Sequence, residues 1–215
     1  MHKRSFTFFH SPDISLQKMK NIKEKVSVVM PAYNETSHIT TSIEEVARTF
    51  IEFGCPWELL VMDDGSSDDT YEKASKLIQK YPQQLIVKKN PFNLGKGRAL
   101  KKALRYLSGD YVVFLDADMD LHPIQAQTLF DIMRLDNADV VIGSKLHPNS
   151  IVSYPLLRRI ISLGYYLLVR LLFNLPCHDT QTGLKLFRAE VLHKVFPRIL
   201  VKKFAFDLEV LVNAH

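Results

Sequence analysis

Between residues 26 and 143, short apolar runs alternate with segments whose apolar residues recur at helical spacing. Apolar runs of this length are typical of strands buried on both faces of a sheet, and each helical segment would provide the crossover to the next parallel strand. The pattern predicts an α/β fold with a mostly parallel sheet flanked by helices. The predicted strands are 26–30, 57–62, 84–88, 111–115 and 139–143, and the predicted helices are 40–53, 69–81, 97–107 and 124–135.

The charge of the chain is distributed unevenly around this region. Residues 1–25 hold six basic and two acidic residues and lack strong periodicity, so we predict a basic flexible arm, either a solvated tail or a segment that contacts a membrane surface. Residues 26–144 carry a net charge of −5, whereas residues 145–203 carry +8. The acidic part is suited to holding a cation, and the basic part is suited to facing phosphates or an anionic membrane surface.

The composition excludes several classes of protein. With 47% hydrophobic and 24% charged residues, the chain can bury a core and is not typical of a disordered protein. Cys55 and Cys177 form no Cys-x-x-Cys pair and are predicted to be reduced structural thiols. The histidines form no cluster with ligand spacing, so no zinc site is predicted. Because no DNA- or RNA-binding motif accompanies the basic part, nucleic acid is not an expected partner.

Polar clusters follow three of the predicted strands. Residues 33–35 follow the first strand, residues 63–64 the second and residues 116–118 the fourth. The carboxyl ends of parallel strands meet at one edge of the sheet, where open α/β sheets bind their ligands. We therefore predict one binding site built from all three clusters.

The acidic cluster after the fourth strand is the strongest candidate for a metal site. In an extended segment, Asp116 and Asp118 point to the same side, and Asp120 has the same parity. Mg²⁺ or Mn²⁺ binds to few carboxylates together with waters and substrate phosphates. Such an ion could neutralise negative charge on a departing nucleotide diphosphate. The alternative is a solvated acidic turn.

The cluster after the second strand has more acidic residues than a helix start requires. Capping the next helix needs only one of Ser67, Asp68 and Asp69. A carboxylate of Asp63 or Asp64 is then left to accept N–H bonds from a nucleobase. Capping alone remains the alternative.

A glycine-containing loop, residues 90–98, opens the third predicted helix. Gly95 and Gly97 free the backbone, while Lys96 and Arg98 supply charge for a diphosphate. The spacing does not match a Walker A loop. A simple helix start explains the glycines equally well.

The segment from residue 156 to residue 175 is apolar and basic. Its uninterrupted apolar run, residues 160–169, would cover about half of a hydrocarbon core, so a membrane span is not predicted. Polar residues spaced by four share one helix face, which fits an amphipathic helix in a membrane interface. An ordinary core helix with a solvated stripe is the alternative. The polar residues are Arg158, Ser162, Tyr166 and Arg170.

These clusters, in this order, resemble the family 2 glycosyltransferases with the GT-A fold. They look most like the synthases that make dolichyl-phosphate or polyprenyl-phosphate mannose or glucose. The matching segments are 31–35 (PAYNE), 63–70 (DDGSSDDT), 93–97 (NLGKG), 116–118 (DAD), 143–145 (GSK), 158–159 (RR), 179–187 (DTQTGLKLF) and 206–209 (FDLE). The resemblance covers about residues 26–215. It implies a nucleotide-sugar and metal half at 26–144 and an acceptor and membrane half at 145–215, the latter expected to be truncated.

The resemblance also implies roles for individual residues. Those implied to bind the nucleotide sugar are Pro31, Tyr33, Glu35, Met62, Asp64, Lys96, Asp116, Ala117, Asp118 and Asp120. Those implied to hold the metal are Asp116, Asp118 and Asp120, and those implied to bind the acceptor phosphate are Lys145, Arg158 and Ser162. The implied catalytic residues are Asp118, Arg158 and Asp179, although the residues alone make Asp179 only a weak candidate. The family often has Arg where Lys145 stands, and some members have Gln where Asp120 stands.

The implied function is transfer of a hexose from GDP-mannose or a UDP-sugar to polyprenyl or dolichyl phosphate, with inversion, as in protein glycosylation. A lipid phosphate is already ionised, so the enzyme would mainly align two anions and offset their repulsion. The expected place is the cytoplasmic face of the plasma membrane or the endoplasmic reticulum. The alternatives are a glycosyltransferase acting on a saccharide hydroxyl and a non-catalytic nucleotide-sugar-binding membrane scaffold.

Overall fold

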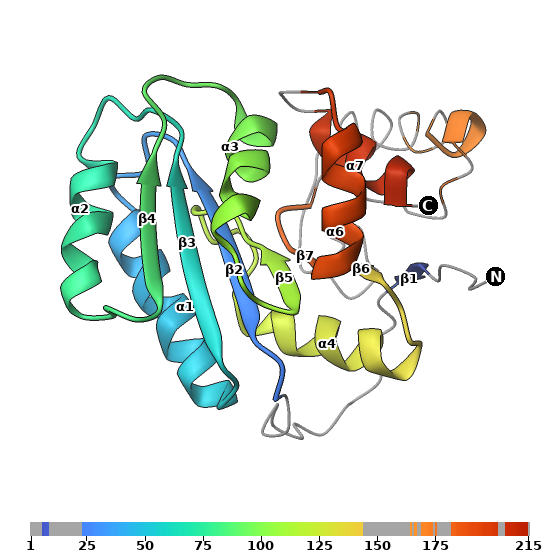
Figure 1. Cartoon of the computed structure of the whole chain (residues 1–215), viewed down its shortest axis with the longest axis horizontal. Coiled ribbons are helices and arrows are strands. Elements are labelled where there is room, and N and C mark those ends of the chain that lie inside the picture. The colour runs from blue at the N-terminus through green and yellow to red at the C-terminus, as the bar shows by residue number, and fades with distance from the viewer. Residues whose placement is uncertain are drawn as a thin grey trace.

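In the computed structural model, a central sheet has helices on both of its faces (Figure 1). The structure describes residues 6–8, 23–143, 164, 166, 169–173, 175, 182–201 and 205–214. Within these residues the sheet has seven strands in the order β1-β6-β7-β5-β2-β3-β4. The strands are β1 (Phe6–Phe8), β2 (Val26–Ala32), β3 (Trp57–Asp63), β4 (Leu85–Lys89), β5 (Tyr111–Phe114), β6 (Val140–Ile142) and β7 (Lys185–Arg188). The helices are α1 (Ile39–Phe53), α2 (Thr70–Lys76), α3 (Lys96–Ala103), α4 (Gln125–Leu135), α6 (Ala189–Val195) and α7 (Phe206–Ala214). Short 3₁₀ turns are η1 (Leu77–Gln79), η2 (Leu104–Tyr106) and η3 (Phe196–Arg198).

The strands and helices predicted between residues 26 and 143 are confirmed, with differences of a few residues at their ends. α1 ends at Phe53, where the sequence predicts a helix stop. The following Gly54 has a φ of 70°, and its N–H donates to the carbonyls of Phe50 and Ile51. Glycine adopts this left-handed conformation without steric cost, which explains why the helix ends there.

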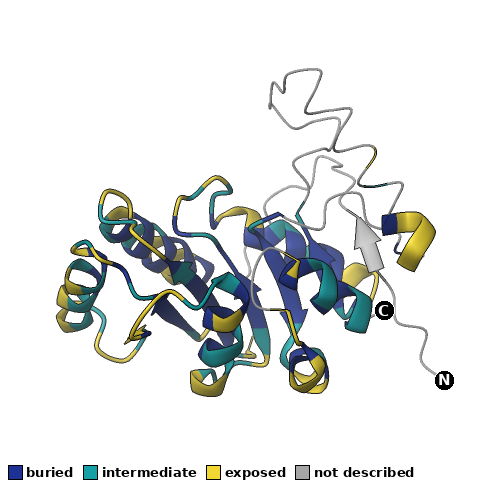
Figure 2. Ribbon diagram, turned by 90° about the horizontal axis from the view of Figure 1, so that it is seen from above, coloured by how far each residue is buried: buried dark blue, intermediate teal, exposed yellow. Residues whose placement is uncertain are grey.

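Each face of the sheet has its own apolar core. In β2, Val28 and Met30 contact the core under α1, α2 and α4, whereas Val29 contacts the core under α3, α6 and α7. Burial of both faces explains why these strands are nearly continuous apolar runs. Strands β2, β3, β5, β6 and β7 are almost entirely buried, β4 is exposed at Lys88 and Lys89, and the helices expose their outer sides (Figure 2). Among the strands, polar side chains therefore gather mainly at the two edges where the strands end.

Two strands differ from the prediction. β7 is not among the predicted strands, and it runs antiparallel between β5 and β6. It is only four residues long and carries Lys185 and Arg188 at its ends, so it lacks a strand-like apolar run. β1 pairs in parallel with β6, inside the segment for which a flexible arm is predicted.

The pairing of β2 with β3 and β5, and of β3 with β4, is parallel, which confirms the predicted class. The carboxyl ends of β2, β3 and β5 therefore meet at one edge, which we call the carboxyl edge. β7 begins at the same edge, because Lys185 is opposite Phe114 at the end of β5. None of the helices in the described part of the chain is long and apolar enough to cross a bilayer.

Candidate functional site

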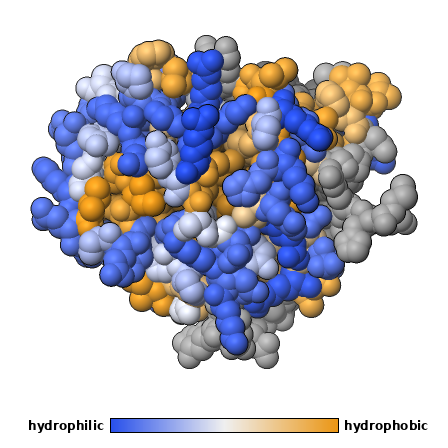
Figure 3. Space-filling model, in the orientation of Figure 1, coloured by the Kyte–Doolittle hydropathy of each residue, from blue (hydrophilic) through white to orange (hydrophobic). Residues whose placement is uncertain are grey.

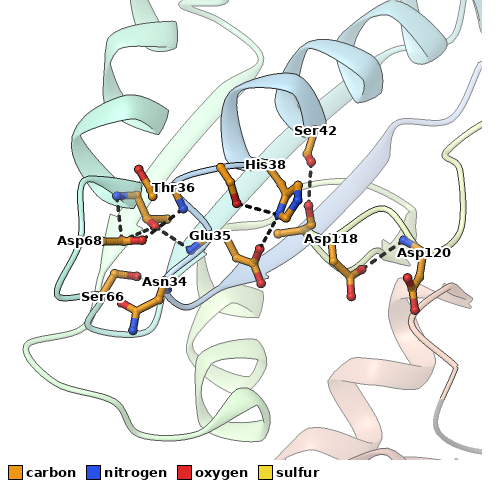
Figure 4. A network of polar contacts seen from close by, with 12 residues as sticks. Asn34, Glu35, Thr36, His38, Ser42, Ser66, Asp68, Asp118 and Asp120 are labelled. Carbon is orange, nitrogen blue, oxygen red and sulfur yellow. Dashed lines mark hydrogen bonds and ion pairs between the residues drawn. The ribbon is translucent and has the colours of Figure 1, made fainter.

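The loop after β2 is joined directly to the loop after β3 (Figure 4). Asn34 has a φ of 57°, and its backbone N–H donates to Ser66 Oγ at 2.9 Å. Its side-chain Oδ1 accepts from the backbone N–H of Ser67 at 3.0 Å. Asparagine tolerates this left-handed conformation better than most residues. Two of the three predicted clusters are thereby brought together at the carboxyl edge.

Asp68 strengthens this junction rather than facing a ligand. Its carboxylate accepts from the backbone N–H groups of Thr36 at 3.2 Å and Thr70 at 3.0 Å. Hydrogen bonding from the Thr70 side chain lowers the pKa of Asp68 below its ordinary value. The N–H of Glu35 donates in turn to Thr70 Oγ1 at 2.8 Å. The acidic excess after β3 is thus partly structural, although it is Asp68 and not Asp69 that bonds the start of α2.

Asp64 holds the loop that opens α3. It is buried, and its carboxylate accepts from Asn90 Nδ2 at 2.7 Å and from the Gly95 N–H at 2.7 Å. The Leu94 N–H lies within hydrogen-bonding distance of both carboxylate oxygens. Asn90 Oδ1 accepts from Lys102 Nζ at 2.8 Å. Nucleobase contact by Asp64 stays a prediction. In the structure, its oxygens fix the backbone of the glycine-containing loop.

Asp63 is the carboxylate with spare hydrogen-bonding capacity. Its Oδ1 accepts from the Ser66 N–H at 2.7 Å, whereas its buried Oδ2 has no hydrogen-bond partner among the described residues. The same is true of Thr182 Oγ1, which lies near the start of β7 at this edge. A buried oxygen without a partner is costly unless a ligand or water satisfies it.

The Asp116–Asp120 segment bends sharply after β5. Met119 adopts a φ of 56°, and the Asp120 N–H donates to Asp118 Oδ1 at 3.2 Å (Figure 4). The hydroxyl of Ser42 in α1 donates to the carbonyl of Ala117 at 2.6 Å, which fixes the middle of the segment. Backbone contacts therefore hold the segment while the Asp118 side chain stays exposed.

Asp116 lies between a cation and a close-packed turn. Lys96 Nζ is 2.6 Å from Asp116 Oδ1, and the two side chains are about a third exposed. A Cβ added to Gly183 would lie 2.5 Å from Asp116 Oδ2, so a larger residue there would force the Asp116 side chain to shift. Asp116 of the Asp-x-Asp segment, Lys96 of the glycine-containing loop and Gly183 of the 179–187 segment therefore lie close together, although they are far apart in the sequence.

The donor atoms present are compatible with a small divalent ion. No group of three or more His, Cys, Asp or Glu residues in the described part of the chain could hold a metal, so Asp116, Asp118 and Asp120 do not form a complete protein cage. Mg²⁺ and Mn²⁺ bind through one or two carboxylates when waters and phosphate oxygens supply the rest. Asp116 and Asp118 supply carboxylates of the kind that such a site uses, and their binding of a metal stays a prediction.

The remaining predicted residues differ in their placement. Pro31 and Met62 are opposite each other in the β2–β3 register, and Met62 is fully buried in the core under α3. Tyr33 is 46% exposed, and Glu35 Oε2 lies 3.2 Å from His38 Nδ1. The predicted residues that lie outside the described part of the chain are Lys145, Arg158, Ser162 and Asp179.

One buried ion pair at this edge was not anticipated. Lys185 Nζ lies 2.6 Å from Asp207 Oδ1 of α7 and also donates to the carbonyl of Thr182. Lys185 is 2% exposed. The pair fixes the turn that carries Gly183 against Asp116. No local pattern reveals it, because its partners are separated by 22 residues.

Two further predictions concern side chains away from the carboxyl edge, namely the cysteine thiols and the polar face of the C-terminal amphipathic segment. Burial raises the pKa of Cys55 to about 11, which agrees with an unreactive structural thiol; Cys177 lies outside the described residues. In the C-terminal amphipathic segment, Arg170 donates to the Tyr166 hydroxyl at 3.0 Å. The spacing of four therefore places these two polar residues on one helix face, as predicted.

A mostly parallel sheet flanked by helices, with an Asp-x-Asp loop and two further polar loops at its carboxyl edge, is the architecture of the GT-A fold. More particularly, the chain belongs to glycosyl transferase family 2, whose family model matches residues 27–196.

Curated relatives include the dolichyl-phosphate beta-glucosyltransferases of Dictyostelium discoideum and Saccharomyces cerevisiae, each 30% identical to the chain. The alignments cover 94% and 88% of this chain and 66% and 62% of the relatives, so the chain spans slightly less than two thirds of their length. Among solved structures, glucosyl-3-phosphoglycerate synthase from Mycobacterium tuberculosis with Mn²⁺, UDP-glucose and phosphoglyceric acid has a TM-score of 0.68. It is 23% identical over 95% of this chain and 70% of that one, and this likeness concerns the fold.

Proposed function

We propose that the chain catalyses transfer of glucose from UDP-glucose to a polyprenyl or dolichyl phosphate. The observation that carries the proposal is the convergence of Asp116, Lys96 and Gly183 at the carboxyl edge. It supports binding of a metal and a diphosphate, in a chain 30% identical to dolichyl-phosphate beta-glucosyltransferases. The choice of UDP is supported by those names and by a structural neighbour that holds UDP-glucose.

On the donor side, Asp116 and Asp118 would hold Mg²⁺ or Mn²⁺. The ion would neutralise charge on the departing nucleotide diphosphate. Lys96, about a third exposed, has the reach and charge to bind a diphosphate oxygen. Asp64 acts through the backbone, because it fixes the N–H groups of Leu94 and Gly95 beside Lys96.

On the acceptor side, the nucleophile is a phosphate oxygen that is already ionised near neutral pH. The chain has to bring this anion up to the sugar, and Lys145, Arg158 and Ser162 are proposed to hold it. Alignment of the two substrates lowers the entropic part of the barrier. Direct attack on the anomeric carbon from the side opposite the diphosphate gives inversion, so an α-linked UDP-glucose would yield a β-linked lipid phosphate.

We further propose that the enzyme works at the cytoplasmic face of a membrane. Leu171, Leu172 and Phe173 are 83%, 62% and 40% exposed, and an apolar patch is visible over this helical segment (Figure 3, upper right). Exposed apolar residues next to a basic segment are typical of a helix in a lipid interface. The nearby Arg170 would remain among headgroups.

The test is a donor screen with polyprenyl phosphate in vesicles, in which transfer of labelled glucose or mannose to the lipid fraction is measured. We expect a metal-dependent glucolipid with UDP-glucose and a loss of at least about a hundredfold in rate for Asp118→Ala. Lys76→Met, an exposed substitution on α2, is the control and should keep full rate. A mannolipid from GDP-mannose alone would overturn the donor assignment. A water-soluble oligosaccharide, or no turnover, would favour a saccharide acceptor or a scaffold instead.

A further inference from the structure

The lysines of α3 have different kinds of partner. Lys101 Nζ donates to the carbonyl of Ile199 at 2.8 Å, and Lys102 Nζ donates to Asn90 Oδ1 at 2.8 Å. Both of these partners are structural. Lys96 instead forms an ion pair with Asp116, a residue whose carboxylate is needed for another purpose in the proposed function.

Of the two members of this pair, Asp116 has the shorter side chain and the closer packing. One of its oxygens lies against Gly183, and the Gly183 turn is anchored by the buried pair of Lys185 and Asp207. Lys96 has a long flexible stem and a side chain that is 35% exposed. When the pair separates, the lysine therefore has the greater freedom to move to another anion.

We propose that Lys96 is the resident counter-ion of Asp116 in the free protein and weakens divalent-cation binding until a nucleotide diphosphate draws the lysine away. The proposal rests on the assignment of Asp116 to the metal site in the proposed function. An ammonium group at 2.6 Å from Oδ1 competes with a cation for the same oxygen and also repels it. The diphosphate offers Lys96 a different anionic partner, so nucleotide and metal favour each other's binding.

The coupling between nucleotide binding and cation binding has to be reciprocal. If nucleotide raises the affinity for the cation by some factor, the cation must raise the affinity for nucleotide by the same factor. Without the ammonium group, part of the gain in cation affinity is already present before nucleotide binds. A variant without the lysine should therefore bind the cation more tightly when no nucleotide is present. If Lys96 only bound phosphate, its removal would leave this affinity unchanged.

The experiment measures Mn²⁺ binding to the full chain by electron paramagnetic resonance of the free ion, with and without UDP. We expect Lys96→Met to raise Mn²⁺ affinity without UDP by about two- to fivefold, the range expected for one partly exposed ion pair. The enhancement that UDP brings should shrink by the same factor. Lys76→Met removes one exposed positive charge elsewhere and should match the wild type.

Two outcomes overturn the proposal in different ways. If Lys96→Met binds Mn²⁺ no more tightly than Lys76→Met while Asp116→Asn abolishes binding, the counter-ion role is wrong and the metal assignment stands. If Asp116→Asn leaves Mn²⁺ binding intact, the metal assignment itself fails, and the coupling fails with it. Circular dichroism of each variant shows whether the fold is preserved.

Discussion

Each edge of the sheet carries a carboxylate paired with a lysine, and the surroundings of the two pairs differ. At the opposite edge, where β2 and β3 begin and which we call the amino edge, Glu58 pairs with Lys25. The Glu58 side chain is 5% exposed. At the carboxyl edge, Asp116 pairs with Lys96, and the Asp116 side chain is 34% exposed. The residue types are alike, so the difference lies in what surrounds them.

Glu58 has its hydrogen-bonding capacity filled by the protein. Besides Lys25, it accepts from Ser27 Oγ at 2.6 Å and from the backbone N–H of Ser108 at 2.6 Å. Burial alone would raise the pKa of Glu58, but these hydrogen bonds outweigh burial and lower it. Among the described residues, Asp116 has only Lys96 as an ion-pair partner. A saturated carboxylate stabilises the fold, whereas a partly exposed one with a mobile partner can exchange that partner for a ligand.

The largest expected effect comes from the buried pair that supports the carboxyl edge. Lys185→Met leaves Asp207 buried without its cation, and we expect a loss of about 3–5 kcal/mol in unfolding free energy. Urea denaturation followed by circular dichroism measures it. The double variant Lys185→Met/Asp207→Leu should recover most of the loss, because a buried pair can be replaced by apolar residues. Failure of the double variant to recover would mean that the hydrogen bond to the Thr182 carbonyl matters more than the charges.

The second prediction separates function from stability at the carboxyl edge. Asp116→Asn should lower the rate of the proposed lipid glucosylation by about a hundredfold or more, because the proposed metal loses a charged ligand. Its unfolding free energy should change by less than about 1 kcal/mol, since partly exposed ion pairs contribute little. A large loss of stability in this variant would remove the contrast with Glu58.

The smallest expected effect is the matching change at the amino edge. Glu58→Gln should cost about 1–3 kcal/mol at neutral pH, because a buried charge-assisted network is broken, and it should leave the glucosylation rate unchanged. Since the folded pKa of Glu58 lies below its ordinary value, the carboxylate stabilises the protein when the pH is above that ordinary pKa. This contribution is lost as the pH falls through the folded pKa.

Denaturation of the wild type and Glu58→Gln at neutral pH and at about pH 3.5 measures this dependence. The difference in stability between the two should shrink on acidification. A difference that stays constant with pH would show that Glu58 acts through packing and not through its charge.

The sequence alone determined the α/β class, the order of strands and helices from residue 26 to residue 143, and the edge at which the polar clusters meet. These features depend on apolar spacing of two to four residues, which is visible locally. The ends of the elements were also local, as the stop at Gly54 shows. The Asp-x-Asp segment was found because both carboxylates lie next to a recognisable strand.

The tertiary structure decided which polar residue contacts which. Only the folded chain places β7 between β5 and β6, joins Lys185 to Asp207, and puts Gly183 against Asp116. It also commits Asp64 to the backbone of the glycine-containing loop, while Asp63 keeps a buried oxygen without a partner among the described residues. Such contacts join residues tens of positions apart. Their energies depend on burial and on competing partners, and neither is encoded in the periodicity of the sequence.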